Sequence, residues 1–225
     1  MVTASEMFEL GTLARWGVVP LVELPSSEAA LPLARTLERV GLPCAEVALR
    51  TDAALRGIAA IRDGCHSVVL GAGTVLTMAQ LDEVLRIGVD FVVTPGFNPA
   101  VVDRCLESGV AILPGVATPT EIDMALARGL DTVKVFPAAV LGGVPFLKAI
   151  AAPYRGVRFV PTGGITATSL AEYLGIPSVL ACGGSWITPP ELVRHGDFEA
   201  VGRLAAEALA IVRRVREPSA GVHDA

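Results

Sequence analysis

Short apolar runs rich in β-branched residues recur along the chain at intervals of roughly 20–25 residues, the spacing of strand–helix repeats. Gly, Pro, Asp or Arg interrupts each run after roughly 5–8 residues, which is typical of buried parallel strands. The pattern predicts strands at Val18–Leu24, Cys44–Leu49, Ser67–Leu70, Phe91–Thr94, Val110–Leu113, Thr132–Phe136, Val157–Pro161 and Ser178–Ala181.

Amphipathic stretches with apolar residues three and four positions apart separate these strands and predict helices. They include Ser5–Arg15 before the first strand, then Glu28–Val40, Met78–Ile87, Pro99–Ser108 and Glu121–Ala127, and Phe198–Val215 at the end. Several begin after residues that commonly cap helices, namely Ser26–Ser27, Thr77, Asn98 and Thr118.

Alternating strands and helices predict βαβ units and a parallel sheet. Eight repeats in this length favour an α/β fold with a single (β/α)8 TIM barrel and an extra N-terminal helix. We expect one barrel domain over residues 1–216 and a polar tail, a candidate for disorder, over residues 217–225. An open doubly wound sheet is the second choice, but Leu24-Pro25-Ser26-Ser27 after the first strand does not match the glycine fingerprint of that fold.

Composition limits the classes of partner. The chain is 52% hydrophobic with a mean hydropathy of +0.57, yet it has no unbroken apolar stretch of about 18 residues that would cross a membrane. A net charge of −5 without a basic block argues against binding to nucleic acid or to an acidic membrane surface. Because Met1–Leu10 has no basic residue, it does not resemble a secretory signal. We therefore expect a cytoplasmic protein.

Cysteine and histidine spacing argues against metal chemistry. The four cysteines lack CxxC spacing, so we expect free thiols in a reducing compartment rather than disulfides or a zinc site. The three histidines show no HxH or HExxH spacing. We expect no metal and no cofactor.

Lys134 is the first candidate for chemistry, because the chain contains only one other lysine, Lys148, in a predicted helix. Within the strand Thr132–Phe136, alternation places Val133 and Val135 on one face and Lys134 on the other, so valines packed against helices direct the lysine into the barrel. A buried lysine is costly to keep charged, and its neutral amine becomes available to attack a carbonyl. A structural ion pair, or a side chain that extends its amine to solvent, is the alternative.

Glu46 and Arg50 supply possible partners, since alternation places them on one face of their strand about 13 Å apart. Active sites of barrels lie at the carboxyl ends of strands, which puts Arg50 near the mouth and Glu46 deeper. A carboxylate beside a Schiff base can transfer protons, and an arginine can bind a carboxylate through two parallel hydrogen bonds. The simpler reading is that Glu46 only neutralises Lys134.

Glycine-rich turns follow three of the predicted strands. They are Gly71-Ala72-Gly73-Thr74, Thr162-Gly163-Gly164-Ile165 and Gly183-Gly184-Ser185. Glycine lets backbone N–H groups approach an anion, and a following helix start adds a favourable dipole. The last two turns follow strands seven and eight, where barrel enzymes usually bind phosphate, and they favour a phosphorylated substrate.

Together these motifs resemble one known family. They are Glu46-Val-Ala-Leu-Arg50-Thr51, Gly71-Ala-Gly-Thr74, Thr94-Pro95-Gly96, Lys134-Val-Phe136-Pro137-Ala138, Pro161-Thr-Gly-Gly-Ile165 and Gly183-Gly-Ser-Trp186. From Gly17 to Trp186 the chain is similar to the 2-keto-3-deoxy-6-phosphogluconate (KDPG) and 4-hydroxy-2-oxoglutarate aldolases.

The resemblance implies a (β/α)8 barrel, usually a homotrimer, that cleaves KDPG to pyruvate and D-glyceraldehyde 3-phosphate without metal. It implies Lys134 as the Schiff-base residue and Glu46 as the acid and base. It further assigns Arg50 and Thr74 to the pyruvate carboxylate, Thr162, Pro95 and Phe136 to the substrate chain, and Gly163, Gly164, Gly184 and Ser185 to the phosphate.

Two positions depart from the family pattern. Threonine is common where Ala48 stands, between Glu46 and Arg50 on the inward face, so one hydroxyl group is missing there. The family also commonly has PAEA after the lysine strand, where this chain has Ala139 in place of the glutamate. Both departures bear on substrate preference and rate more than on reaction type.

Three alternatives stay open. The same chemistry on the galactonate epimer or on 4-hydroxy-2-oxoglutarate is possible, although the Ser185 turn favours a phosphorylated substrate. A metal-dependent phosphosugar epimerase would need histidines at strand ends, and no histidine lies in a predicted strand. The third alternative is a phosphosugar-binding sensor without enzymatic activity. It would not explain why Lys134, Glu46 and Arg50 are all predicted at the same end of the barrel.

Overall fold

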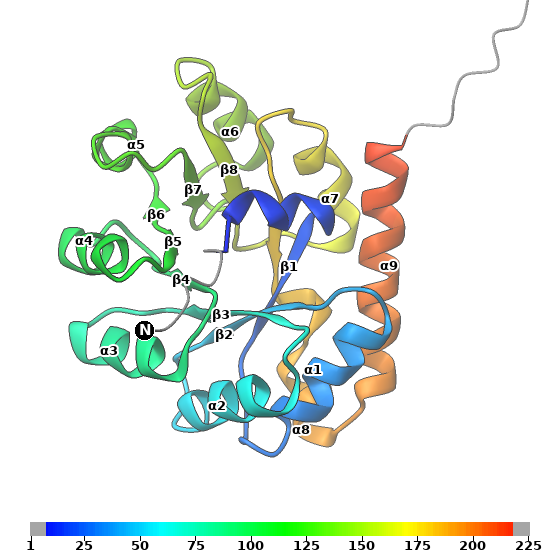
Figure 1. Ribbon diagram of the computed structural model, residues 1–225. Helices are drawn as coiled ribbons and strands as arrows, with labels where there is room; N and C mark the ends of the chain where they lie inside the picture. Colours follow the sequence, from blue (N-terminus) through cyan, green and yellow to red (C-terminus); the bar gives the residue numbers. More distant parts are fainter. Residues whose placement is uncertain (1–7, 218–225) are drawn as a thin grey trace, which may run out of the picture.

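Parallel strands form the centre of the computed structural model, which describes residues 8–217. The strands are β1 (Val18–Val22), β2 (Cys44–Ala48), β3 (Val69–Gly73), β4 (Phe91–Val93), β5 (Ala111–Leu113), β6 (Gly115–Val116), β7 (Thr132–Val135), β8 (Arg158–Pro161) and β9 (Cys182–Gly184). They pair in the orders β5-β4-β3-β2-β1-β9 and β6-β7-β8. The fold is therefore α/β with a curled parallel sheet (Figure 1).

The two ladders meet at irregular positions. Pro114 alone separates β5 from β6, because proline has no N–H to continue a ladder. Its carbonyl accepts a hydrogen bond from the Lys134 N–H at 2.9 Å. On the other side, isolated parallel bridges join Phe159 to Val179 and Thr162 to Gly183. The sheet thus differs from the predicted eight regular strands by this interruption and by the bridges that replace a full β8–β9 ladder.

Helices surround the sheet (Figure 1). They are α1 (Ala30–Arg39), α2 (Ala54–Gly64), α3 (Met78–Ile87), α4 (Pro99–Ser108), α5 (Pro119–Leu126), α6 (Gly143–Ala151), α7 (Ala167–Leu174), α8 (Pro190–His195) and α9 (Phe198–Arg216), with 3₁₀ turns η1 (Leu10–Arg15) and η2 (Ser185–Ile187). Within residues 8–217, none of these helices has the length and apolarity needed to cross a membrane.

Strand alternation divides the buried apolar side chains into two clusters. The larger cluster joins outward strand residues such as Val47 and Val133 to helix residues such as Leu37. The smaller cluster lies inside the curled sheet and includes Phe91 and Val160. Each such side chain contributes about 1.5–3 kcal/mol when fully buried, so both faces of every strand are held in place.

Capping explains where several helices begin. The Thr77 hydroxyl accepts a hydrogen bond from the Gln80 N–H at 3.2 Å, and the Asn98 side chain accepts one from the Ala100 N–H at 3.1 Å. The Glu121 carboxylate accepts from the Thr118 N–H at 2.8 Å. These predicted caps are confirmed. The serine cap is wrong, because α1 begins at Ala30, after Ala29.

Two strand predictions miss an end of the observed strand by more than two residues. The third strand was expected at Ser67–Leu70 but extends to Gly73, and the last was expected at Ser178–Ala181 but lies at Cys182–Gly184. Glycine has low strand propensity, which is why both segments resembled turns.

The chain ends also differ from the prediction. In place of an α-helix over Ser5–Arg15, the described part holds only the 3₁₀ turn η1 from Leu10 to Arg15. Gly11 lowers the helix propensity of so short a segment, and Glu9 makes no side-chain cap. Residues 5–7 lie outside the described residues, as does the predicted tail beyond Glu217.

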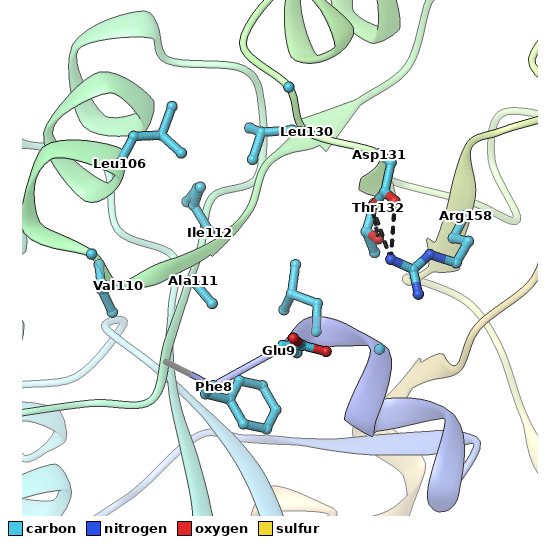
Figure 2. Close-up of a pocket in the computed structure, with 14 residues that line it drawn as sticks. Phe8, Glu9, Leu106, Val110, Ala111, Ile112, Leu130, Asp131, Thr132 and Arg158 are labelled. Carbon is cyan, nitrogen blue, oxygen red and sulfur yellow. Dashed lines mark hydrogen bonds and ion pairs between the residues drawn. The ribbon is translucent and has the colours of Figure 1, made fainter. Parts of the chain in front are cut away.

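A pocket of about 420 Å³ opens at the amino ends of the strands. Figure 2 shows Phe8 and Glu9 on one side and Ile112 and Leu130 on the other. At its rim the Arg158 guanidinium donates to the Asp131 carboxylate at 2.9 Å. Active sites of barrels form at the opposite, carboxyl end, where the candidate residues of this chain gather.

Candidate active site

Lys134 and Glu46 form a buried ion pair inside the curled sheet. The Lys134 Nζ lies 3.1 Å from the Glu46 Oε1, and the two side chains are 6% and 3% exposed. Val133 and Val135 pack outward in the cluster shared with the helices, so the lysine points inward, as alternation predicts. Removing two charges from water costs about as much as the pair regains, so stability gives little reason to keep this pair. A role in chemistry explains the buried pair better than a role in stability.

Gly73 makes room for the Glu46 carboxylate. The two residues lie on neighbouring strands, with Gly73 paired to Ala48, and a Cβ atom at Gly73 would lie 2.3 Å from the Glu46 Oε1. Gly73 is also the last residue of β3, so the sequence prediction that it belongs to a turn is wrong. Its position after a run of strand-forming residues was the available signal, because glycine within a strand often marks a close approach.

Thr162 and Phe136 complete the surroundings of the lysine. Thr162 is 2% exposed and follows β8, whose Val160 pairs with Lys134. A Cβ atom at Gly183 would lie 2.3 Å from the Thr162 Oγ1, so this glycine gives the threonine its space. The ring of Phe136 has its centroid 5.5 Å from the Lys134 Nζ. Phe136 therefore lies beside the lysine, and Thr162 lies two residues beyond the strand partner of the lysine.

The two glycine turns assigned to phosphate begin side by side. The parallel bridge between Thr162 and Gly183 brings together the segments that continue as Gly163-Gly164 and Gly184-Ser185. Gly163 and Gly164 have φ values of +96° and +75°, a backbone region that favours glycine. The Ala139 N–H donates to the Gly163 carbonyl at 3.0 Å. The geometry leaves a glycine-lined edge at the start of α7, where N–H groups and the helix dipole favour an anion.

Thr74 and Pro95 also lie at the ends of strands. Thr74 follows Gly73 and, among the residues described, is the one non-glycine with a positive φ, +59°. A β-branched residue rarely adopts this conformation, and such strain is most common at functional sites. Pro95 is half-buried after β4, and a Cβ atom at Gly115 would lie 2.2 Å from its carbonyl oxygen.

Arg50 does not contact the ion pair. Because β2 ends at Ala48, Arg50 lies in a turn and its N–H donates to the Ala48 carbonyl at 2.8 Å. Strand alternation therefore does not determine its direction. Its side chain is 43% exposed, and Nη1 lies 3.8 Å from the Oε2 of Glu23, which follows β1. Sequence reasoning missed Glu23, since nothing local connects two residues 27 positions apart.

Comparison with known proteins places this chain in a family. The model of the family described as KDPG and KHG aldolase matches residues 11–204. The chain belongs to the KDPG and KHG aldolase family.

Individual members of the family are similar over most of the chain. The 2-dehydro-3-deoxy-phosphogluconate aldolase of Treponema pallidum is 52% identical over 200 residues, 89% of this chain and 95% of that protein. The KDPG aldolase of Zymomonas mobilis ZM4, solved with 3-phosphoglycerate, has a TM-score of 0.84 at 39% identity and covers 91% of this chain and 97% of its own. The KDPG aldolase of Legionella pneumophila, solved with pyruvate as a covalent carbinolamine, has a TM-score of 0.86 at 34% identity, with 89% and 98% covered.

The cysteines of this aldolase are poorly suited to nucleophilic roles. All four are free and buried, in agreement with the predicted free thiols. Burial raises the pKa of the Cys105 thiol to about 12, and burial, with the charge of Glu46 second, raises the pKa of the Cys44 thiol as well. They therefore stay protonated near neutral pH. Residues 8–217 also contain no cluster of three or more His, Cys, Asp or Glu side chains arranged to bind a metal ion.

Gly73→Ala should lower aldolase turnover by about 10- to 100-fold, because the added methyl group displaces the Glu46 carboxylate from Lys134. Overpacking at a buried position should also cost about 1–3 kcal/mol of unfolding free energy. Steady-state assays and urea denaturation measure both effects. Gly156→Ala is the matched control, since no atom lies within 4 Å of a Cβ there and its φ is not positive. Wild-type activity in Gly73→Ala would contradict the role of this glycine.

Proposed function

We propose that this chain is a class I aldolase that cleaves KDPG to pyruvate and D-glyceraldehyde 3-phosphate, with Lys134 as the Schiff-base nucleophile. The observation that carries the proposal is the buried contact of 3.1 Å between the Lys134 Nζ and the Glu46 Oε1. The relative from Legionella pneumophila, solved with pyruvate as a covalent carbinolamine, supports the same type of intermediate.

Covalent catalysis begins with a neutral amine. In the proposed mechanism Glu46 accepts a proton from the Lys134 ammonium, which is within hydrogen-bonding distance. The amine attacks the C2 carbonyl of the substrate to form a carbinolamine. Protonated Glu46 then returns its proton to the departing hydroxyl group, so that loss of water gives an iminium ion and restores the Glu46 carboxylate. The iminium ion withdraws electrons from the C3–C4 bond, so that this bond can break heterolytically.

Glu46 then acts on the substrate. It takes the proton of the C4 hydroxyl group, directly or through water, as the C3–C4 bond breaks and the aldehyde forms. The electron pair remains on the lysine-bound fragment as an enamine. Protonation at C3 and hydrolysis of the resulting imine release pyruvate and restore Lys134.

The remaining residues bind the substrate in this proposal. Arg50 and Thr74 hold the pyruvate carboxylate, for which a guanidinium group can supply two parallel hydrogen bonds. Thr162, Pro95 and Phe136 contact the substrate chain. The phosphate binds along Gly163, Gly164, Gly184 and Ser185, supported by the neighbouring glycine turns and the start of α7.

The alternatives within the same chemistry are KDP-galactonate and 4-hydroxy-2-oxoglutarate. The two phosphorylated epimers differ in the configuration of one hydroxyl group, and relative kcat/KM values for them decide the preference. The exposed Ser185, at the start of η2 beside the Gly163–Gly164 turn, favours a phosphorylated substrate over hydroxyoxoglutarate.

We also infer that the two ladders form one closed (β/α)8 barrel domain over residues 1–216. The bridges Phe159–Val179 and Thr162–Gly183, and the single residue that separates β5 from β6, support closure. A homotrimer, which the family resemblance implies, is part of the proposal, and sedimentation equilibrium tests it. Cytoplasmic location and the absence of a cofactor remain predictions.

Borohydride trapping tests the proposed function. Reduction in the presence of pyruvate should leave a pyruvyl adduct on Lys134, because the imine is converted to a stable secondary amine. The chain has only two lysines, so peptide mass mapping distinguishes Lys134 from the exposed Lys148. A folded protein that forms no adduct at saturating pyruvate, or forms it on Lys148, would contradict the Schiff-base assignment.

A further inference from the structure

Glu23 lies at the mouth of the candidate site, on the inner side of β1. Val22 and Leu24, on either side of Glu23, both belong to the outer cluster, and Val19 belongs to the inner one. The alternation therefore continues past the end of β1 and places Glu23 on the inner face. Leu21 pairs with Glu46, and the same register continued by two residues sets Glu23 opposite Ala48.

The ends of β1 and β2 remain adjacent beyond the ladder. The Thr51 hydroxyl donates to the Leu24 carbonyl at 2.8 Å and ties the two segments together. Glu23 therefore lies beside the segment that carries Arg50. Ala48, between them, offers only a methyl group and no hydroxyl that could hydrogen-bond to either side chain.

The contact between Arg50 and Glu23 is a single, partly solvated one. Nη1 and Oε2 are 3.8 Å apart, and both side chains are 43% exposed. Within residues 8–217, Arg50 makes no other side-chain ion pair or hydrogen bond. A pair of this kind is weak, corresponding to at most about fivefold in an equilibrium constant. A second carboxylate can therefore displace Glu23 from the guanidinium group or share that group with it.

We propose that Glu23 is a positioning residue that competes with the substrate carboxylate for Arg50 and thereby sets the affinity of the site for α-keto acids. The inference rests on the proposed function, in which Arg50 binds that carboxylate. A substrate carboxylate that binds the guanidinium through two hydrogen bonds must replace Glu23 or lie beside its charge. Both effects weaken binding, and neither acts on the chemistry at Lys134, so they alter KM and leave kcat unchanged.

Glu23→Gln is the direct test, because it removes the charge and keeps the shape of the side chain. The pyruvate concentration that half-saturates borohydride trapping on Lys134 should fall by about two- to fivefold. The KM for the phosphorylated keto acid should fall similarly, with kcat within about twofold, and the difference should shrink in high salt because exposed charges are screened. Glu83→Gln is the matched control, since Glu83 is a partly exposed glutamate paired with Arg86 on α3.

A neutral ketone distinguishes competition for the substrate carboxylate from an effect of Glu23 that does not involve that carboxylate. Methyl pyruvate carries no carboxylate. The concentration that half-saturates its trapping on Lys134 should therefore be the same in the wild type and in Glu23→Gln. An unchanged or higher half-saturating pyruvate concentration in Glu23→Gln overturns the competition, as does an equal shift with methyl pyruvate. Trapping of the wild type in the same experiment establishes the proposed function separately, so these outcomes refute only the role of Glu23. A wild type that forms no adduct refutes both.

Discussion

Lys134→Ala should lower the rate of aldol cleavage by at least about 10⁴-fold, because removing a covalent nucleophile removes the whole route through the iminium ion. No neighbouring group can replace it. The only other lysine, Lys148, is exposed on α6, and burial keeps the Cys44 thiol protonated. Steady-state cleavage of KDPG, coupled to pyruvate detection, measures the loss.

The same substitution also changes stability, which must be separated from chemistry. Without the lysine, the Glu46 carboxylate is buried and unpaired, and breaking a buried pair in this way costs about 3–5 kcal/mol. Thermal unfolding and circular dichroism show whether the variant is folded under assay conditions. Lys148→Ala should retain normal activity and stability. Normal turnover by folded Lys134→Ala would refute the Schiff-base assignment.

Glu46→Gln should lower kcat by about 10²- to 10⁴-fold, the usual contribution of a positioned general acid–base group. Glutamine has nearly the same shape and can still accept a hydrogen bond from Lys134, but it cannot take up the proton of the C4 hydroxyl group. Imine formation depends less on the Glu46 carboxylate than cleavage does. Borohydride trapping by pyruvate should therefore be reduced less than cleavage. Rapid-quench measurements of both steps in one variant reveal this separation.

Glu191→Gln provides the control for Glu46→Gln, because Glu191 is an exposed glutamate that pairs with Arg194 on α8. It should leave both trapping and cleavage unchanged. If cleavage by Glu46→Gln stayed within about twofold of the wild type, Glu46 would have only the structural role of neutralising Lys134. If trapping and cleavage fell equally, its role would be confined to freeing the amine.

The sequence by itself determined the features that depend on local periodicity. Strand alternation over Thr132–Val135 was sufficient to direct Lys134 inward, because neighbouring side chains point to opposite faces of any strand. Helix starts at Thr77 and Asn98 were equally local, since the capping bonds join residues two or three positions apart. The family motifs, which occur in order along the chain, identified the chemistry.

Only the tertiary structure decided how separate strands share space. Gly73 and Gly183 resembled parts of turns, and their role as gaps for Glu46 and Thr162 depends on side chains of neighbouring strands. The direction of Arg50 was likewise undetermined, because β2 ends two residues earlier and its partner Glu23 lies just after β1. Such contacts join positions far apart in the sequence, and strand register together with the curl of the sheet sets them.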